Sequence, residues 1–269
     1  MAVVPVVLTI AGSDSVAGAG IQADLKTFAA FEVYGVSAVT AITAQNTLGV
    51  FATQEIDPAI VAAQVDAVVA DPGVDVVKTG MLSSTPIIEV VVERLRRHGL
   101  RRVVVDPVMV AKGGDRLLRE DAVNILRDLL LPLALVVTPN TAEAEVLAGR
   151  PVRDLDEARA AAKAIGEMGP RYVVVKGGHF GEDATDVLYD GVRCTEFAAL
   201  RIPTTSTHGT GCTYASAIAA GLAHGHEMEE AVGQAKEYVH RAISAAFAVG
   251  AGHGPLHHFH QWWTPPRGG

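Results

Sequence analysis

Short runs of Val, Ile, Leu and Ala alternate along the chain with longer stretches in which apolar residues recur every three or four positions. Such runs are typical of strands buried on both faces, and such stretches are typical of amphipathic helices. The runs predict strands at Val4–Ile10, Val36–Thr43, Val74–Lys78, Arg102–Val105, Leu135–Thr138 and Tyr172–Lys176. The stretches predict helices at Ala19–Phe31, Pro58–Val69, Thr85–His98, Glu120–Leu130, Ala142–Ala148 and Leu155–Met168.

The pattern changes after residue 180. Asp186–Leu200 predicts a β-hairpin with Asp190-Gly191 at its turn, and two further helices are predicted at Gly211–His224 and Met228–Val249. Strands that alternate with helices favour an α/β fold with a parallel sheet covered on both faces. No linker, repeat or low-complexity segment divides the chain, so we expect a single domain over residues 1–269.

Composition narrows the function classes. Hydrophobic residues make up 49% and charged residues 19% of the 269 residues, which excludes a disordered chain and indicates a large core. The net charge of -8 disfavours a nucleic-acid-binding surface but permits a local phosphate site. The N-terminus lacks a basic region, no apolar run approaches the about 20 residues that span a bilayer, and the 2 cysteines suit a reducing compartment. We therefore expect a cytoplasmic protein without nucleic-acid or membrane partners.

The strongest chemical motif is THGTGC, residues 207–212, which precedes a helix of small residues. A Gly-rich turn before a helix offers free backbone N–H groups and a positive dipole to an anion, such as a phosphoryl group in transfer. The helix start should make the Cys212 thiol easier to ionise, so that it can act as a base or nucleophile. The alternative is a tight turn at Gly209 and Gly211, with Cys212 as a small buried apolar residue.

Two further motifs follow predicted strands. Asn140 and Glu143 of TPNTAE share a first helical turn, where they either hold a hydrated Mg²⁺ or cap the helix. Lys176, before Gly177-Gly178, either reaches a phosphate or lies in solvent, and Gly113-Gly114 also follows a strand. Because ligands of open α/β sheets bind at the carboxyl ends of strands, we expect the site at this edge.

The N-terminal glycines and two polar residues favour a small ligand. The spacing in AGSDSVAGAGIQAD, residues 11–24, fits neither G-x-G-x-x-G nor a Walker loop, which disfavours a dinucleotide-dependent oxidoreductase. Asp24 and Gln45 lie at the predicted sheet edge, where an amide suits the edge of an aminopyrimidine ring. Helix-surface polarity and turn formation are the alternatives for both. The C-terminal histidines, which include His257 and His258, match no strong zinc pattern.

Together these segments resemble the hydroxymethylpyrimidine/phosphomethylpyrimidine kinases of the ribokinase-like superfamily. Along nearly the whole chain, the resemblance is carried by TIAGSDSVAGAGIQADLKTF, AITAQNTLGV, KTGML, VVDPVMVAKGG, TPNTAEAEVL, VKGGH, THGTGCTYASAIAAGL and GPLHHFHQWW. It implies a three-layer α/β/α fold with a mainly parallel central sheet, a homodimer, ATP and Mg²⁺. It also implies phosphorylation of 4-amino-5-hydroxymethyl-2-methylpyrimidine and then of its monophosphate, in thiamin biosynthesis.

The resemblance assigns roles to individual residues. The catalytic set would be Cys212 with an anion hole formed by Gly209, Thr210 and Gly211. The ATP contacts would be Lys176, Asn140 and Thr207, and the Mg²⁺ residues would be Asn140, Glu143 and Asp106. The pyrimidine would be recognised by Asp24 and Gln45, in a site lined by Gly12, Ala19, Met81 and Val108.

Two other functions stay open. A pyridoxal kinase of the same superfamily would share the fold, the ATP site and Cys212. A non-catalytic pyrimidine-binding protein would not need Lys176, Asn140 and Glu143, so their presence disfavours it. The sequence departs from the usual Ser/Gly-rich stretch at Ser15-Val16-Ala17, where bulkier residues would stiffen the loop over the substrate and affect substrate preference.

Overall fold

The computed structural model describes residues 4–110, 117–178 and 183–265, and the structural statements below concern these residues. The strands are β1 (Val6–Asp14), β2 (Tyr34–Asn46), β3 (Gly49–Glu55), β4 (Val76–Thr79), β5 (Val103–Val105), β6 (Val136–Val137), β7 (Tyr172–Val175), β8 (Asp183–Tyr189) and β9 (Cys194–Leu200). The helices are α1 (Gly20–Ala30), α2 (Pro58–Ala70), α3 (Thr85–Arg97), α4 (Glu120–Ile125), the π turn η1 (Leu126–Leu130), the 3₁₀ turn η2 (Leu131–Leu133), α5 (Thr141–Ala148), α6 (Leu155–Gly166), α7 (Thr210–Ala223) and α8 (Met228–Ser244).

Within the described ranges, the strands form one nine-stranded sheet in the order β3-β2-β1-β4-β5-β6-β7-β8-β9. The strands from β2 to β7 in that order pair in parallel, whereas β3, β8 and β9 pair antiparallel with their neighbours. The carboxyl ends of β1, β4, β5, β6 and β7 therefore meet at one edge of the sheet, where α/β proteins bind their ligands.

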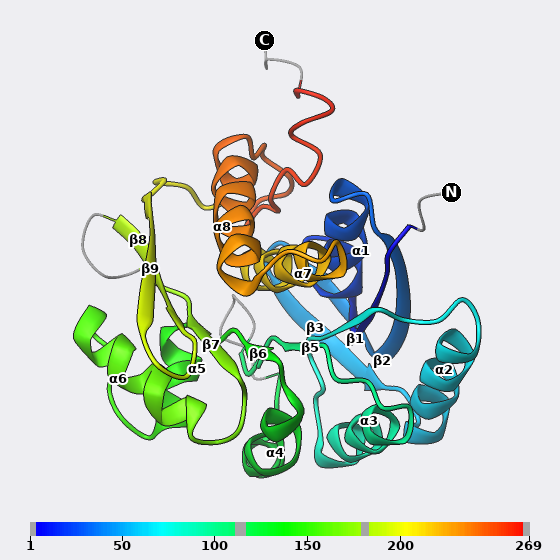
Figure 1. Ribbon diagram of the computed structural model, residues 1–269. Coiled ribbons are helices and arrows are strands. Elements are labelled where there is room, and N and C mark those ends of the chain that lie inside the picture. The colour runs from blue at the N-terminus through cyan, green and yellow to red at the C-terminus, as the bar shows by residue number, and fades with distance from the viewer. Residues whose placement is uncertain (1–3, 111–116, 179–182, 266–269) are drawn as a thin grey trace.

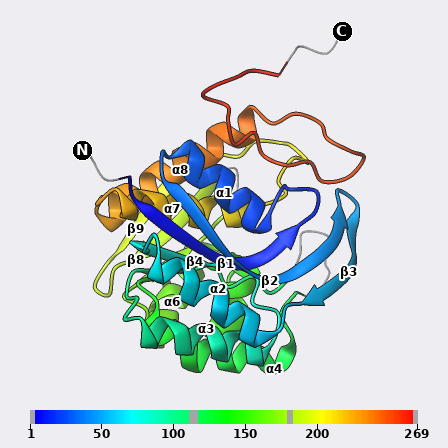
Figure 2. The same ribbon diagram turned by 90° about the vertical axis from the view of Figure 1, so that its right-hand side faces the viewer.

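Helices cover both faces of the sheet (Figures 1 and 2). Helices α2, α3, α4, α5 and α6 lie on one face, and α1, α7 and α8 lie on the other. Side chains alternate between these layers as a strand period of two requires. In β5, for example, Val103 and Val105 pack with the first layer and Val104 packs with the second. The strands therefore read as unbroken apolar runs because both of their faces are buried.

The predicted strands and helices are found, with shifted ends. Strand β1 continues to Asp14, four residues beyond its predicted end, and carries the chain directly into the site. Helix α8 ends at Ser244 and not at Val249. Strand β3 was missed because it is an edge strand with both faces largely exposed, so its sequence has no buried alternation. The Gly113-Gly114 pair lies outside the described residues.

Helix ends show how local sequence places the site. Asn140 caps α5 and Asp154 caps α6 with side-chain oxygens that accept backbone N–H bonds, as these residue types favour. Pro at the first positions of α2 and α3 is compatible with the missing hydrogen bonds of a first turn. Among the described helices, none is long and apolar enough to cross a bilayer.

Candidate active site

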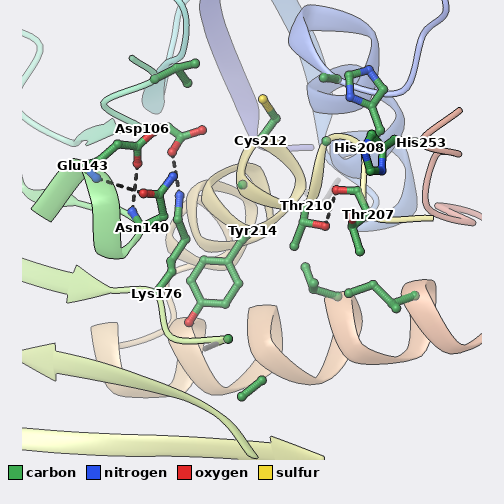
Figure 3. Close-up of a pocket in the computed structure, with 18 of the residues that line it drawn as sticks. Asp106, Asn140, Glu143, Lys176, Thr207, His208, Thr210, Cys212, Tyr214 and His253 are labelled. Carbon is green, nitrogen blue, oxygen red and sulfur yellow. Dashed lines mark hydrogen bonds and ion pairs between the residues drawn. The ribbon is translucent and has the colours of Figure 1, made fainter. Parts of the chain in front are cut away.

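A cavity of about 1590 Å³ opens at the carboxyl edge of the sheet. Its wall includes most of the residues that the sequence singled out: Gly12, Ala19, Gln45, Met81, Asp106, Val108, Asn140, Glu143, Lys176, Thr207, Gly209, Thr210, Gly211 and Cys212. Figure 3 shows Cys212 between two groups of side chains, with Asp106, Asn140, Glu143 and Lys176 on one side and Thr207, His208 and His253 on the other. The fold thus brings segments from most of the chain into one space.

The turn before α7 has the geometry of an anion hole. Gly209 is the N-cap of α7 and has φ 82°, a left-handed conformation that suits glycine. A Cβ on Gly209 would collide with the carbonyl oxygen of Gly18, so two glycine turns touch here. Thr210 Oγ1 donates to Thr207 O at 2.8 Å and fixes the turn. The first turn of α7 therefore lines the cavity in a fixed arrangement, with N–H groups that have no partner within the helix and with the positive end of the helix dipole.

Cys212 lies in the first turn of α7 and lines the cavity. Burial raises the pKa of its thiol to about 12, with Asp106 and Asp24 acting in the same direction against Lys78 and the Gly20 N–H. The expectation of an easily ionised thiol is therefore wrong for the ligand-free protein. Desolvation of a thiolate outweighs the favourable effect of the helix start, so the thiol is neutral near pH 7.

Lys176 and Asp106 form a buried ion pair across the sheet edge. Lys176 Nζ donates to Asp106 Oδ1 at 2.8 Å, and a Cβ on Gly211 would lie 3.2 Å from the same nitrogen. Burial disfavours the charge on Lys176, yet Asp106 and Glu143 raise the pKa of its ammonium above the ordinary value. A positive charge is therefore held beside the turn at Gly211, where a phosphate oxygen can take the place of Asp106.

Asn140 and Glu143 cap α5 reciprocally, as the capping alternative predicted. Asn140 N donates to Glu143 Oε2 at 2.8 Å, and Glu143 N donates to Asn140 Oδ1 at 2.9 Å. The pKa of Glu143 is raised to about 7, chiefly by burial and also by the nearby carboxylate of Asp106, while Lys176 acts in the opposite direction. Two buried carboxylates that repel each other are a donor set that Mg²⁺ fits, because this ion takes few protein ligands and keeps its waters.

The loop after β1 is fastened to the anion-hole turn by a carboxylate that the sequence analysis did not single out. Asp14 accepts N–H bonds from Gly18 at 3.0 Å and Ala19 at 2.8 Å, and His208 Nε2 lies 2.9 Å from Asp14 Oδ2. Burial opposes its charge, but these bonds hold the pKa of Asp14 below the ordinary value. Gln45 Nε2 lies 3.4 Å from His208 Nε2, so the predicted pyrimidine contact sits on this junction.

A model of the phosphomethylpyrimidine kinase family matches residues 14–257 of the chain. The hydroxymethylpyrimidine/phosphomethylpyrimidine kinase of Rhizobium meliloti (strain 1021) is 56% identical over 263 residues, which cover 96% of this chain and 98% of the relative. The chain belongs to the phosphomethylpyrimidine kinase family. The resemblance noted from the sequence motifs is thereby confirmed.

Solved structures agree with this assignment. The phosphomethylpyrimidine kinase of Clostridium difficile 630 superposes with a TM-score of 0.80 at 43% identity, covering 89% of this chain and 99% of the other. An ADP complex of Bacillus subtilis pyridoxal kinase superposes with a TM-score of 0.90 at 42% identity, covering 96% of this chain and 99% of the other. The three-layer α/β/α ribokinase-like fold, expected from the resemblance, is confirmed.

Asp24 does not have the position that a substrate contact needs. The Asp24 side chain is fully buried and is not part of the described cavity wall. Its carboxylate accepts bonds from Lys78, Thr9 and Ser216. The predicted pyrimidine contact is therefore corrected to a structural contact, because no oxygen of Asp24 is left to face a ligand.

Two further charged residues of the cavity wall, Asp186 and Lys236, were not predicted from the sequence. Asp186 of β8 accepts the Gly177 N–H at 2.8 Å and pairs with Lys236 of α8 at 2.9 Å. This pair ties the turn after β7 to α8. Asp186 carries no motif of its own, and Lys236 lies mid-helix, so only the fold shows that they meet.

The C-terminal histidines pack and do not form a metal site. His258 Nε2 lies 3.0 Å from Thr213 Oγ1, and burial lowers the pKa of His258 to about 3, so its ring is neutral. His257 Nε2 donates to Trp263 O at 2.8 Å. No group of three or more His, Cys, Asp or Glu residues in the described chain could hold a metal ion. The segment instead braces the first turns of α7.

Proposed function

We propose that the protein transfers the γ-phosphate of ATP to the hydroxymethyl group of 4-amino-5-hydroxymethyl-2-methylpyrimidine, and then a second phosphate to the monophosphate, in thiamin biosynthesis. One observation carries the proposal: an anion-hole turn, the Lys176–Asp106 pair and Cys212 line one cavity in a chain 56% identical to a hydroxymethylpyrimidine/phosphomethylpyrimidine kinase. A non-catalytic binding protein would need no such constellation.

In this proposal the hydroxymethyl oxygen attacks the γ-phosphorus, the bond from that phosphorus to the bridging oxygen breaks, and ADP leaves. The N–H groups at Gly209–Cys212 bind the charge on the transferred group, since fixed dipoles stabilise charge that develops in transfer. Lys176 moves from Asp106 to a phosphate oxygen. The hydroxyl proton passes to the thiolate form of Cys212, which is a small fraction near pH 7 because burial raises the thiol pKa.

Asp106, Glu143 and the side chain of Asn140 would hold Mg²⁺ through its waters. When bound, the ion supplies positive charge that offsets the charge of the triphosphate. Release of Asp106 from Lys176 frees one of its oxygens for this role. The raised pKa of Glu143 supports the assignment, because a cation would favour the ionised carboxylate that burial disfavours.

The pyrimidine would lie between Gln45 and Met81, near Gly12, Ala19 and Val108. Gln45 has one amide nitrogen beside His208, and Gly12 leaves room for Met81, whose sulfur is 3.1 Å from the position of a Cβ on that glycine. A paired donor and acceptor on Gln45 suits the exocyclic amine and ring nitrogen of an aminopyrimidine. The remaining contacts are apolar and suit the face of the ring.

Pyridoxal is a second candidate substrate. The likeness to Bacillus subtilis pyridoxal kinase, at 42% identity and a TM-score of 0.90, supports this candidate. The assay that separates the two candidates incubates the enzyme with Mg-ATP and, in separate reactions, hydroxymethylpyrimidine or pyridoxal, and follows products by mass. Appearance of the monophosphate and then the diphosphate supports the proposal, and absence of both with intact pyridoxal turnover contradicts it.

We also propose that the chain is a single cytoplasmic domain that forms a homodimer. A continuous sheet from β3 to β9 supports one domain, which would unfold in a single cooperative transition. Exposed apolar side chains on the β2–β3 ribbon support the dimer: Ile42 is 52%, Leu48 66% and Phe51 68% exposed. Clustered apolar exposure of this kind marks an association surface.

A further inference from the structure

A lysine and an aspartate are enclosed beneath the cavity in a single network. Lys78 of β4 and Asp24 of α1 are each 0% exposed, and Lys78 Nζ lies 2.9 Å from both carboxylate oxygens. Thr9 Oγ1 donates to Asp24 at 2.6 Å, and Ser216 Oγ donates at 2.7 Å. The carboxylate is saturated with donors, and no solvent reaches either charge.

Such a pair is not explained by stability. Removing two charges from water costs more than their attraction returns in many proteins, and apolar residues of similar volume often stabilise a core better. On this face of the sheet the neighbouring strand side chains are apolar and buried, with Val7 two residues before Thr9 and Val76 two residues before Lys78. A buried ion pair at this place therefore suggests a use for the charge itself.

The network lies directly behind Cys212. Ser216 follows Cys212 by four residues in α7, so the two side chains lie on the same helix face one turn apart. A Cβ on Gly80 would lie 2.8 Å from Lys78 Nζ, and the next residue, Met81, lines the cavity. The ammonium thus ends just below the cavity floor, under the first turns of α7.

The charged groups that face Cys212 come from every element around it. Lys78 of β4 and Asp24 of α1 lie below, and Asp106 after β5 lies at the side with its partner Lys176 after β7. Of these, Lys78 acts most strongly to lower the pKa of the thiol, after burial has raised it. The charge of Lys176 is offset by its bond to Asp106, and Asp106 itself disfavours a thiolate, so Lys78 is the charged group that favours one.

We propose that Lys78 is a positioning residue for catalysis: Asp24, Thr9 and Ser216 fix its ammonium behind Cys212, where it stabilises negative charge on the sulfur. The inference rests on the proposed role of Cys212 in phosphoryl transfer and adds a source of charge that this role requires. Asp24 holds the lysine in place and at the same time weakens its field at the sulfur. Substitutions of the two residues should therefore affect the thiol in opposite directions.

The test measures the alkylation of Cys212 by iodoacetamide in the ligand-free enzyme, between pH 7 and 9, with peptide mass analysis. Below the thiol pKa, each unit of pKa shift changes the rate at fixed pH by about tenfold. Lys78→Met should slow alkylation of Cys212 about tenfold or more. Asp24→Asn should accelerate it about tenfold, because the ammonium is then uncompensated.

Two controls separate charge from loss of structure. Cys194 is half-buried in β9 and serves as an internal reference whose alkylation rate should stay constant in all variants. Lys236→Met breaks a largely buried Lys–Asp pair of the same length, with Asp186, and should leave the Cys212 rate unchanged. Asp24→Asn/Lys78→Met leaves no unpaired charge, and its Cys212 should alkylate at a rate between those of the wild-type enzyme and Lys78→Met, because the opposing carboxylate is removed with the ammonium.

Equal Cys212 rates in all variants, or changes of the same sign in Lys78→Met and Asp24→Asn, would overturn the proposal. The measurement needs no substrate, so it stands apart from the proposed function. An enzyme that fails to phosphorylate hydroxymethylpyrimidine but shows the opposed rate changes keeps the role of Lys78. An enzyme that turns over both pyrimidines but does not show the opposed rate changes contradicts the role of Lys78.

Discussion

The thiol of Cys212 sets the chemistry at the residue scale. A general base works best with a pKa near the working pH, and burial places this thiol far above it. The thiolate fraction near pH 7 is therefore small, and in the proposed mechanism the reaction relies on the fixed N–H groups of the turn and on Lys176 for most of its acceleration. A slow but well-placed base is compatible with phosphoryl transfer, because its loose transition state needs little early deprotonation of the alcohol.

This account predicts a turnover rate that rises with pH. For wild-type enzyme, kcat/KM should increase by up to about tenfold per unit between pH 7 and 9, as the thiolate fraction grows. Cys212→Asp introduces a base that ionises at a lower pH than the thiol, so it should retain activity and its profile should level off at a lower pH than that of the wild type. Cys212→Ala should lose on the order of 10²-fold, the usual contribution of a general base. Identical pH profiles for wild type and Cys212→Asp would show that the thiol is not the proton acceptor.

Substitution of Glu143 should change stability and activity in opposite directions. Burial raises the pKa of this carboxyl from 4.5 to about 7, so between these values the folded state holds a proton that the unfolded chain has released. The free energy of unfolding therefore falls as pH rises through this window. Glu143→Gln keeps an oxygen for the Asn140 N–H and removes this effect.

Thermal unfolding of Glu143→Gln and wild type at pH 5 and pH 8 tests the sign. The variant should melt roughly 5 °C above wild type at pH 8 and close to it at pH 5. Its Mg-ATP turnover should fall at both values, because the carboxylate proposed for Mg²⁺ is lost. A variant that is less stable than wild type at pH 8 would contradict the burial effect.

The positions of residues at the cavity were predictable where a motif holds the residue at a strand end or helix start. Lys176, Asn140 and Cys212 all face the cavity as expected. The partners were not predictable from local motifs. Asp106, Lys78 and Asp186 each meet a partner that lies 50 or more residues away in the sequence, and only the fold brings the pairs together. Asp24 shows the limit most plainly, since a motif residue turned out to face the core.

At the scale of elements, the site depends on two glycine turns that touch. Gly18 follows β1, and Gly209 precedes α7, and neither has room for a Cβ because each would collide with the other segment. Asp14 and His208 join the same two turns by a hydrogen bond of 2.9 Å. The loop after β1 and the turn before α7 are therefore one unit, and a change in either turn should disturb both the proposed substrate binding and the proposed transfer.

Gly209→Ala tests this unit. The substitution should lower kcat/KM on the order of 10²-fold, because even small displacement of reacting groups is costly. It should also cost about 1–3 kcal/mol of stability from backbone strain. Gly225, with φ 90° and no atom within 4 Å of a Cβ, is the matched control. Gly225→Ala should cost roughly 1–2 kcal/mol and leave turnover unchanged. Equal turnover in both variants would contradict the close-approach argument.

Helices and buried strands were predictable because their apolar periodicity is long and unbroken. Strand β3 was not, since an edge strand with exposed faces has no such signal. The end of α8 was placed five residues late because AAFAVG continues the apolar pattern, although the helix has already stopped at Ser244. The path of the C-terminal segment against Thr213 depends on His258, whose contact with α7 no local pattern encodes.

At the scale of the whole molecule, the β2–β3 ribbon extends the sheet beyond the helical layers and carries exposed Leu48 and Phe51 (Figure 2). If this ribbon forms the proposed dimer, Phe51→Asp should convert the protein to a monomer in sedimentation experiments at micromolar concentration. Val192→Asp is the control, because Val192 is 87% exposed at the tip of the β8–β9 hairpin and should leave association unchanged. A wild-type monomer would contradict the proposal outright.

The most direct test of the central claim is an ADP-release assay with Mg-ATP and three separate acceptors: hydroxymethylpyrimidine, its monophosphate and pyridoxal. The account predicts ADP release with both pyrimidines, with the diphosphate as the end product by mass, and loss of both activities together in Cys212→Ala. Release with pyridoxal alone, or with none of the three acceptors, would contradict it.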